Sequence, residues 1–147
     1  RPAVAGFAFG GRMTAAGHIA VGMLIDQHCP SELAFGAGML GHAAMDYLLP
    51  EYRPWPPGDN IPIIAWEAVA SYVLLREAYK REEKAGVLGR LAPDVVDGVY
   101  SLLNPQAWQR GTLICPWHRA GIFKRDMSWA LTFAVEAILI ALALAGD

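Results

Sequence analysis

Apolar runs separated by proline-rich or charged segments divide the chain into four parts. Residues 13–26 and 31–49 form the first two runs, and Pro30 and Pro50 follow their ends. Proline disfavours a helical conformation at the residue before it, and Ser31 is a favourable helix N-cap. The pattern therefore predicts two helices joined by a short turn.

The second half of the chain predicts two more long helices and a less regular segment. One helical pattern covers residues 61–85, apolar at first and charged towards its end, and another covers residues 127–145. Residues 86–125 mix short apolar pieces with glycine, proline and asparagine, which predicts a short helix and an ordered loop. We expect an all-α bundle of four or five helices that forms a single domain over residues 1–147. Residues 1–12 carry no such pattern, and in an alternative interpretation the domain begins at Met13 and residues 1–12 are upstream or cloning-derived sequence.

The composition indicates that much apolar surface faces something other than water. The 147 residues are 54% hydrophobic and 18% charged, with a formal net charge of −2. This excludes a disordered tail and a nucleic-acid binder. At about 1.5 Å per residue, runs such as 31–49 and 127–145 approach the roughly 30 Å thickness of a bilayer core. We therefore expect about three membrane-spanning helices, and the alternative is a soluble bundle rich in alanine, leucine and glycine.

Basic residues gather at residues 76–90 and 110–125, which would lie on the cytoplasmic side of the membrane. Small residues recur between positions 34 and 44, which favours close packing of the second helix against a neighbour. The same small-residue face could instead admit a haem or chlorin ring beside His42. The protein would then be a non-catalytic membrane subunit, packed against larger partners in a pigment- or haem-containing complex.

Histidines and aspartates gather in the first two predicted helices. His42 and Asp46 are four residues apart, so both project from one helix face, and His18 lies on the helix before them. Asp26 and His28 fall in the connecting turn. Imidazole and carboxylate ligands suit zinc, manganese or iron, so these groups could share one cation. The alternative is that His42 and Asp46 form a hydrogen-bonded helix contact and that the turn residues are solvated.

Three sequence boxes resemble a known family. They read MTAAGH at residues 13–18, LIDQHCP at residues 24–30 and GHAAMDYLLP at residues 41–50. This arrangement resembles the bacterial inner-membrane family of metal-dependent hydrolase-like proteins, in which a histidine follows Met-Thr and a His-x-x-x-Asp box precedes a proline. The resemblance covers residues 13–57, and the family's middle box, His-Arg-Gly followed by Thr-His-Ser, is absent from that region.

The resemblance implies a small helical protein of the bacterial inner (cytoplasmic) membrane that contacts the lipid bilayer. It also implies a divalent metal, zinc or manganese, held by His18, Asp26, His28, His42 and Asp46. A bound ion would activate water for attack on an ester or phosphoester.

Two glutamates, Glu67 and Glu136, fall inside apolar runs. In lipid, a carboxylate at such a depth should face the bundle interior and find a proton, a metal or a basic partner. Glu67 is the candidate general base, because it begins the third helix across the loop from Asp46. In a soluble bundle both glutamates would be ordinary exposed residues.

The two cysteines, Cys29 and Cys115, can pair or remain free. Cys115 and His118 are three residues apart and could bind a structural zinc ion together with Cys29 and His28. The alternative is a buried cysteine next to a surface histidine.

Overall fold

The structure is a computed structural model of the chain, and it describes residues 14–48, 61–104, 106, 114–115 and 129–146. The described residues form five helices and no strand: α1 (Ala15–His28), α2 (Ser31–Leu48), α3 (Ile61–Lys80), α4 (Ala85–Leu103) and α6 (Trp129–Ala145). The expected all-α class and helix number are confirmed for this part of the chain.

The first helices begin and end near the predicted residues, for local reasons. The side chain of Thr14 caps α1 by accepting a hydrogen bond from the Gly17 N–H, at 3.2 Å. At the other end of α1 the Cys29 N–H donates to the Ile25 carbonyl at 2.8 Å, just before Pro30. The third helix is shorter than predicted, since it ends at Lys80 and Glu82 takes a left-handed conformation with φ 62°. The fourth is longer than predicted, because it begins at Ala85 and continues through Pro93.

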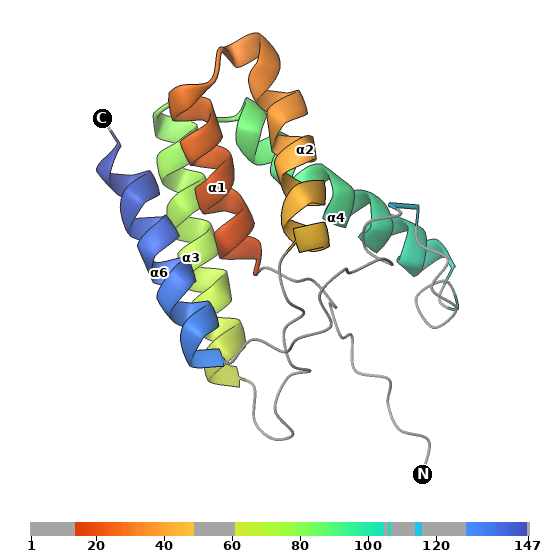
Figure 1. The fold of residues 1–147 in the computed structure, drawn as a ribbon. Coiled ribbons are helices and arrows are strands. Elements are labelled where there is room, and N and C mark those ends of the chain that lie inside the picture. The colour runs from red at the N-terminus through yellow and green to blue at the C-terminus, as the bar shows by residue number, and fades with distance from the viewer. Residues whose placement is uncertain (1–13, 49–60, 105, 107–113, 116–128, 147) are drawn as a thin grey trace.

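Helix α1 runs through the middle of the bundle, with α3 and α6 on one side and α2 and α4 on the other (Figure 1). The core contains apolar residues of α1, α3, α4 and α6. Its buried members are Ala16, Ile19, Ala20, Met23, Ala70, Leu74, Ala78, Val87 and Ala143. The core residues of α1 begin at Ala16, so burial against α3, α4 and α6 also fixes the position of its N-terminal turn.

Glycines bring α4 into backbone contact with α1 and α2. A Cβ atom at Gly22 would lie 2.5 Å from Val87 Cα, and one at Gly38 would lie 2.5 Å from the Gly86 carbonyl oxygen. A Cβ atom at Gly89 would overlap the Phe35 carbonyl oxygen. The predicted close packing through residues 34–44 is confirmed, and α4 is the helix that this face packs against.

The expectation of about three membrane-spanning helices is not met by the described part of the chain, where no helix combines the length and the hydropathy needed to cross a membrane. Helix α1 has 14 residues and α6 has 17. At about 1.5 Å per residue, both are shorter than the roughly 30 Å hydrocarbon core. Helix α2 has 18 residues, but Glu32, His42 and Asp46 interrupt its apolar sequence.

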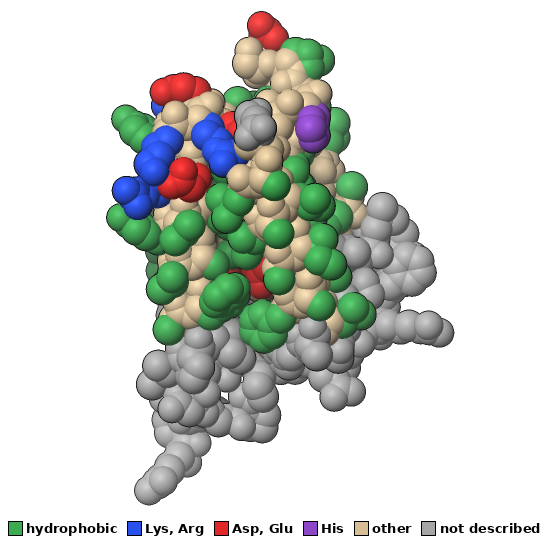
Figure 2. Space-filling view, turned by 90° about the vertical axis from the view of Figure 1, so that its left-hand side faces the viewer, with side chains coloured by type: hydrophobic (Ala, Val, Ile, Leu, Met, Phe, Trp, Pro, Cys, Tyr) green, Lys and Arg blue, Asp and Glu red, His purple; other side chains and the backbone are tan. Residues whose placement is uncertain are grey.

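One side of the bundle nevertheless exposes many large apolar side chains. We call this the α3–α6 face, and it consists of Trp66, Val69, Tyr72, Val73, Leu75, Leu131, Val135, Ile138 and Leu142. Figure 2 shows apolar side chains spread along this side, with Lys, Arg, Asp and Glu side chains gathered at one end. The basic residues follow the end of α3 at Lys80, Arg81 and Lys84.

Candidate metal centre

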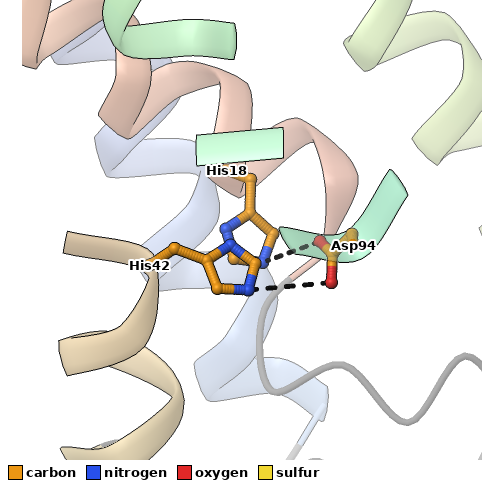
Figure 3. Close-up of side chains that lie close together, drawn as sticks. All are labelled: His18, His42 and Asp94. Atoms are coloured by element: carbon orange, nitrogen blue, oxygen red, sulfur yellow. Dashed lines mark ion pairs between the residues drawn. The ribbon is translucent and has the colours of Figure 1, made fainter. Parts of the chain in front are cut away.

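Three side chains from three helices converge on one point: His18 of α1, His42 of α2 and Asp94 of α4 (Figure 3). His18 Nε2 lies 3.6 Å from Asp94 Oδ2, and His42 Nε2 lies 3.7 Å from Asp94 Oδ1. One ligand atom from each residue lies within 4.8 Å of the other two. This group could therefore hold a metal ion.

The two imidazole rings are stacked, with centroids 4.4 Å apart and an interplanar angle of 13°. His18 is 1% exposed and His42 is 0% exposed, whereas the side chain of Asp94 is 37% exposed. The nitrogen ligands thus lie inside the bundle while the carboxylate reaches solvent. A cation at this point would be accessible from the side of Asp94.

A hydrogen bond fixes the orientation of one imidazole. His42 Nδ1 lies 2.6 Å from the Arg90 carbonyl oxygen. Because a carbonyl oxygen can only accept, Nδ1 carries the hydrogen in this contact, and in the neutral ring Nε2 is the nitrogen without a hydrogen. Metal-binding histidines commonly have such an arrangement, with the second ring nitrogen donating to a carbonyl or a carboxylate.

Helix α4 supplies two parts of this centre on consecutive turns. Arg90 provides the carbonyl that orients His42, and Asp94 follows four residues later on the same helix face. Both reach α2 because Gly38 and Gly89 allow the two backbones to approach closely. The geometry of the centre thus depends on the α2–α4 contact.

The structure brings together His18 and His42 from the predicted ligand set, but not Asp26 or His28. Asp26 instead accepts hydrogen bonds from the Gly86 N–H at 2.8 Å and the Val87 N–H at 3.3 Å. It thereby caps the N-terminus of α4, where a negative charge is favourable. His28 is exposed at the end of α1. Asp46 lies in α2, and its side chain is outside the described part.

Glu67, the predicted general base, is also outside the group of three. Its carboxyl lies at the N-terminus of α1, where Oε2 accepts a hydrogen bond from the Ala16 N–H at 3.4 Å, and it is paired with Glu136 of α6. Burial raises the pKa of Glu67 above its usual value. The prediction that both glutamates face the interior agrees with this position, since Glu136 is 4% exposed.

The cysteine hypothesis can be followed only in part, because His118 lies outside the described residues. Cys29 and Cys115 are free thiols. The Cys115 N–H donates to the carboxylate of Asp97 on α4, at 3.1 Å from Oδ1, and Cys115 Sγ lies 3.8 Å from the Pro93 carbonyl oxygen. In the part of the chain that the structure describes, neither cysteine belongs to a group able to hold a metal ion.

Asp94 is the member of the centre that sequence reasoning missed. It follows Pro93 within residues 86–125, where a short helix and an ordered loop were expected, whereas the structure has one helix from Ala85 to Leu103. A signal was present in the glycines, because both α2 and α4 carry pairs spaced three residues apart, Gly38 with Gly41 and Gly86 with Gly89. Small residues let two helix backbones approach closely, but they do not identify the partner helix, so they could not by themselves place Asp94 near His42.

The chain matches no family model, no curated protein and no solved structure.

Proposed function

We propose that the protein binds a divalent cation through His18, His42 and Asp94 and uses it to hydrolyse an ester or phosphoester. The observation that carries this proposal is the convergence of two buried imidazoles on one carboxylate that reaches solvent. Two neutral nitrogen ligands and one carboxylate suit zinc, and manganese is the alternative.

Three protein ligands leave part of the coordination shell of a divalent cation open, as in catalytic rather than structural zinc sites. An ion held there would supply Lewis acidity to a water molecule or to a substrate oxygen. The protein's own contribution is to orient His42 through the Arg90 carbonyl and to leave Asp94 at the open side. Glu67 is not assigned the role of general base in this proposal, because its carboxyl lies with Glu136.

The proposal is tested by measuring the metal content and the hydrolytic activity of the same preparation. We expect purified protein to carry an equimolar amount of zinc or manganese and to hydrolyse bis(p-nitrophenyl) phosphate or p-nitrophenyl acetate. Removing the metal with a chelator should abolish the activity, and adding it back should restore it. Asp94→Asn should lower both metal content and activity, because an amide oxygen is a weaker ligand than a carboxylate. If the protein binds metal but shows no hydrolysis that depends on the metal, the protein is a metal-binding protein and the enzymatic part of the proposal is refuted.

We also propose that the α3–α6 face contacts the lipid bilayer of the bacterial inner membrane. Soluble monomers rarely expose many large apolar side chains on one side, and this exposure is what supports lipid contact. The basic side chains at one end add little, because Lys80 is paired with Glu77 and Lys84 with Glu82. The high apolar fraction of the sequence agrees with this placement. A neighbouring membrane subunit is the alternative occupant of the same face.

Co-flotation with vesicles that contain anionic lipid tests this second proposal. The protein should float with the vesicles, and the double substitution Val69→Glu with Ile138→Glu should reduce the bound fraction, because it places two charges on the face. Leu40→Glu is the matched control, since Leu40 is 74% exposed on α2 and away from the α3–α6 face. Lipid contact would be contradicted if the wild type does not float with the vesicles, or if the double variant floats as well as the wild type.

A further inference from the structure

Three helices meet at the N-terminus of α1, where two carboxyl groups lie together. Glu136 Oε1 of α6 accepts a hydrogen bond from the Gly17 N–H at 3.1 Å and another from the Thr14 hydroxyl. Glu67 Oε2 of α3 accepts one from the Ala16 N–H at 3.4 Å. One oxygen of each carboxyl group is therefore used to bind the first turn of α1.

The other two oxygens, Glu67 Oε1 and Glu136 Oε2, are buried, and no N–H or O–H donor in the described part of the chain reaches them. The two carboxyl groups are within hydrogen-bond reach of each other. Two adjacent carboxylates in a buried site repel each other and cannot both remain ionised at little cost. A single proton shared by the two carboxyl groups would remove the repulsion and form a hydrogen bond between them.

The groups around this pair favour one negative charge rather than two. From α1 the pair receives the Thr14 hydroxyl and the backbone N–H groups, and the positive end of the helix dipole stabilises a single charge. Ser71 of α3 and Thr132 of α6 lie one helical turn away from Glu67 and Glu136, on the same helix faces. Among the described residues, no basic side chain from any helix acts on either carboxyl, and the next titratable group along α1 is His18.

We propose that Glu67 and Glu136 share one proton at neutral pH, and that this proton holds α3 and α6 against the N-terminus of α1. Loss of the proton at alkaline pH would leave two facing carboxylates and loosen the junction. The pair is thus a pH-sensitive latch on the helix turn that precedes His18.

The sign of the pH dependence follows from burial. Desolvation raises the pKa of both groups, and desolvation together with repulsion from Glu67 raises the pKa of Glu136 to about 8. In an unfolded chain the same glutamate would have its ordinary pKa of 4.5 and would release the proton there. The folded state therefore holds more protons than the unfolded state between these limits, and its stability falls as pH rises through this window. The contribution of the carboxyl pair to the stability of the folded state is most favourable below pH 4.5, and it no longer changes with pH above pH 8.

Thermal unfolding of Glu136→Gln across pH 5 to 9 tests the latch. Glutamine has the size of a protonated glutamic acid and cannot be deprotonated, so the variant should melt close to the wild type at pH 5. At pH 9 it should melt above the wild type, by on the order of 5 °C. Glu67→Gln should give the same pattern. The matched control is Glu32→Gln, an exposed residue of α2 that should follow the pH profile of the wild type.

Infrared spectroscopy detects the shared proton directly. The wild type should show the C=O band of a protonated carboxyl group at pH 7, and the band should disappear as the pH passes about 8 and be missing from Glu136→Gln. Absence of the band from the wild type at pH 7, or equal pH profiles of melting for wild type and Glu136→Gln, would overturn the proposal. Loss of an equimolar amount of bound metal in Glu136→Gln would also overturn it, because the pair would then hold a cation instead of a proton. His42→Ala does not alter the pair, so the latch and the metal centre can fail independently.

Discussion

Replacing His42 by alanine is expected to remove the divalent cation from the purified protein, whereas replacing His28 by alanine should leave the metal content unchanged. His42 is fully buried with Nε2 facing Asp94, while His28 is exposed at the end of α1. Loss of a residue that hydrogen-bonds to a metal ligand typically lowers the affinity for the metal about 10–100-fold, and loss of the ligand itself should lower it further. Elemental analysis after dialysis and competition with a chelator measure both variants.

A second substitution separates loss of the ligand from loss of the fold. His42→Asn keeps a side-chain N–H at the position of Nδ1, where it can donate to the Arg90 carbonyl, but its amide is a poor ligand for zinc. We expect this variant to melt close to the metal-free wild type and to bind metal as weakly as His42→Ala. A folded His42→Asn protein with full metal content would show that His42 is not a ligand and would remove the basis of the proposed function.

Local sequence signals were sufficient for the helical class, for the beginnings of α1 and α2 and for the pairing of the two histidines. Thr14 and Ser31 stand at the starts of these helices, and Pro30 separates them, so each boundary depends on residues close in sequence. His18 and His42 meet because a short turn folds the second helix back beside the first. This relation could be predicted without knowing the rest of the fold.

Helix α4 could not be predicted in the same way, because its stability and position depend on tertiary contacts. Its glycines and Pro93 are poor helix formers by intrinsic propensity. In the fold, Asp26 caps its first turn from α1. The same glycines that weaken the isolated helix let it pack against backbone on both sides. The third ligand, Asp94, was missed because its proximity to His42 exists only after this packing.

The sequence also offered another carboxylate, closer to His42, as the predicted ligand. Asp46 lies four residues after His42 on the same helix, which is the spacing expected for two ligands on one face. The carboxylate that faces both imidazoles is instead that of Asp94 on α4, 52 positions after His42 in the chain. Spacing rules describe contacts within one helix and give no information on contacts between distant helices.

The metal centre and the fold therefore depend on the same contact between α2 and α4. Gly89 lies against the Phe35 carbonyl oxygen one residue before Arg90, whose own carbonyl orients His42. Any displacement of α4 at this point would move both Arg90 and Asp94 relative to the two imidazoles. Stability and metal binding should consequently change together when this contact is altered.

Gly89→Ala is expected to destabilise the protein strongly, by about 3 kcal/mol, because the added Cβ would overlap the Phe35 carbonyl oxygen. Both atoms belong to packed helix backbones, so neither can move aside without separating α2 from α4. Gly98→Ala on the same helix is the matched control. A Cβ at Gly98 meets nothing within 4 Å, so this substitution should stabilise the helix by about 0.5–1 kcal/mol. Urea unfolding of the two variants measures the difference.

Metal binding by the same two variants tests whether the glycine contact sets the geometry of the centre. Under conditions where Gly89→Ala remains folded, we expect its affinity for the cation to be reduced, because Asp94 moves with α4 away from His18 and His42. Gly98→Ala should bind metal like the wild type, since Gly98 lies one turn beyond Asp94 and touches neither α1 nor α2. Equal stability of the two variants would contradict the close α2–α4 approach. Reduced stability of Gly89→Ala with unchanged metal affinity would show that the centre tolerates displacement of α4, so that the ligands must be held together by contacts other than Gly89.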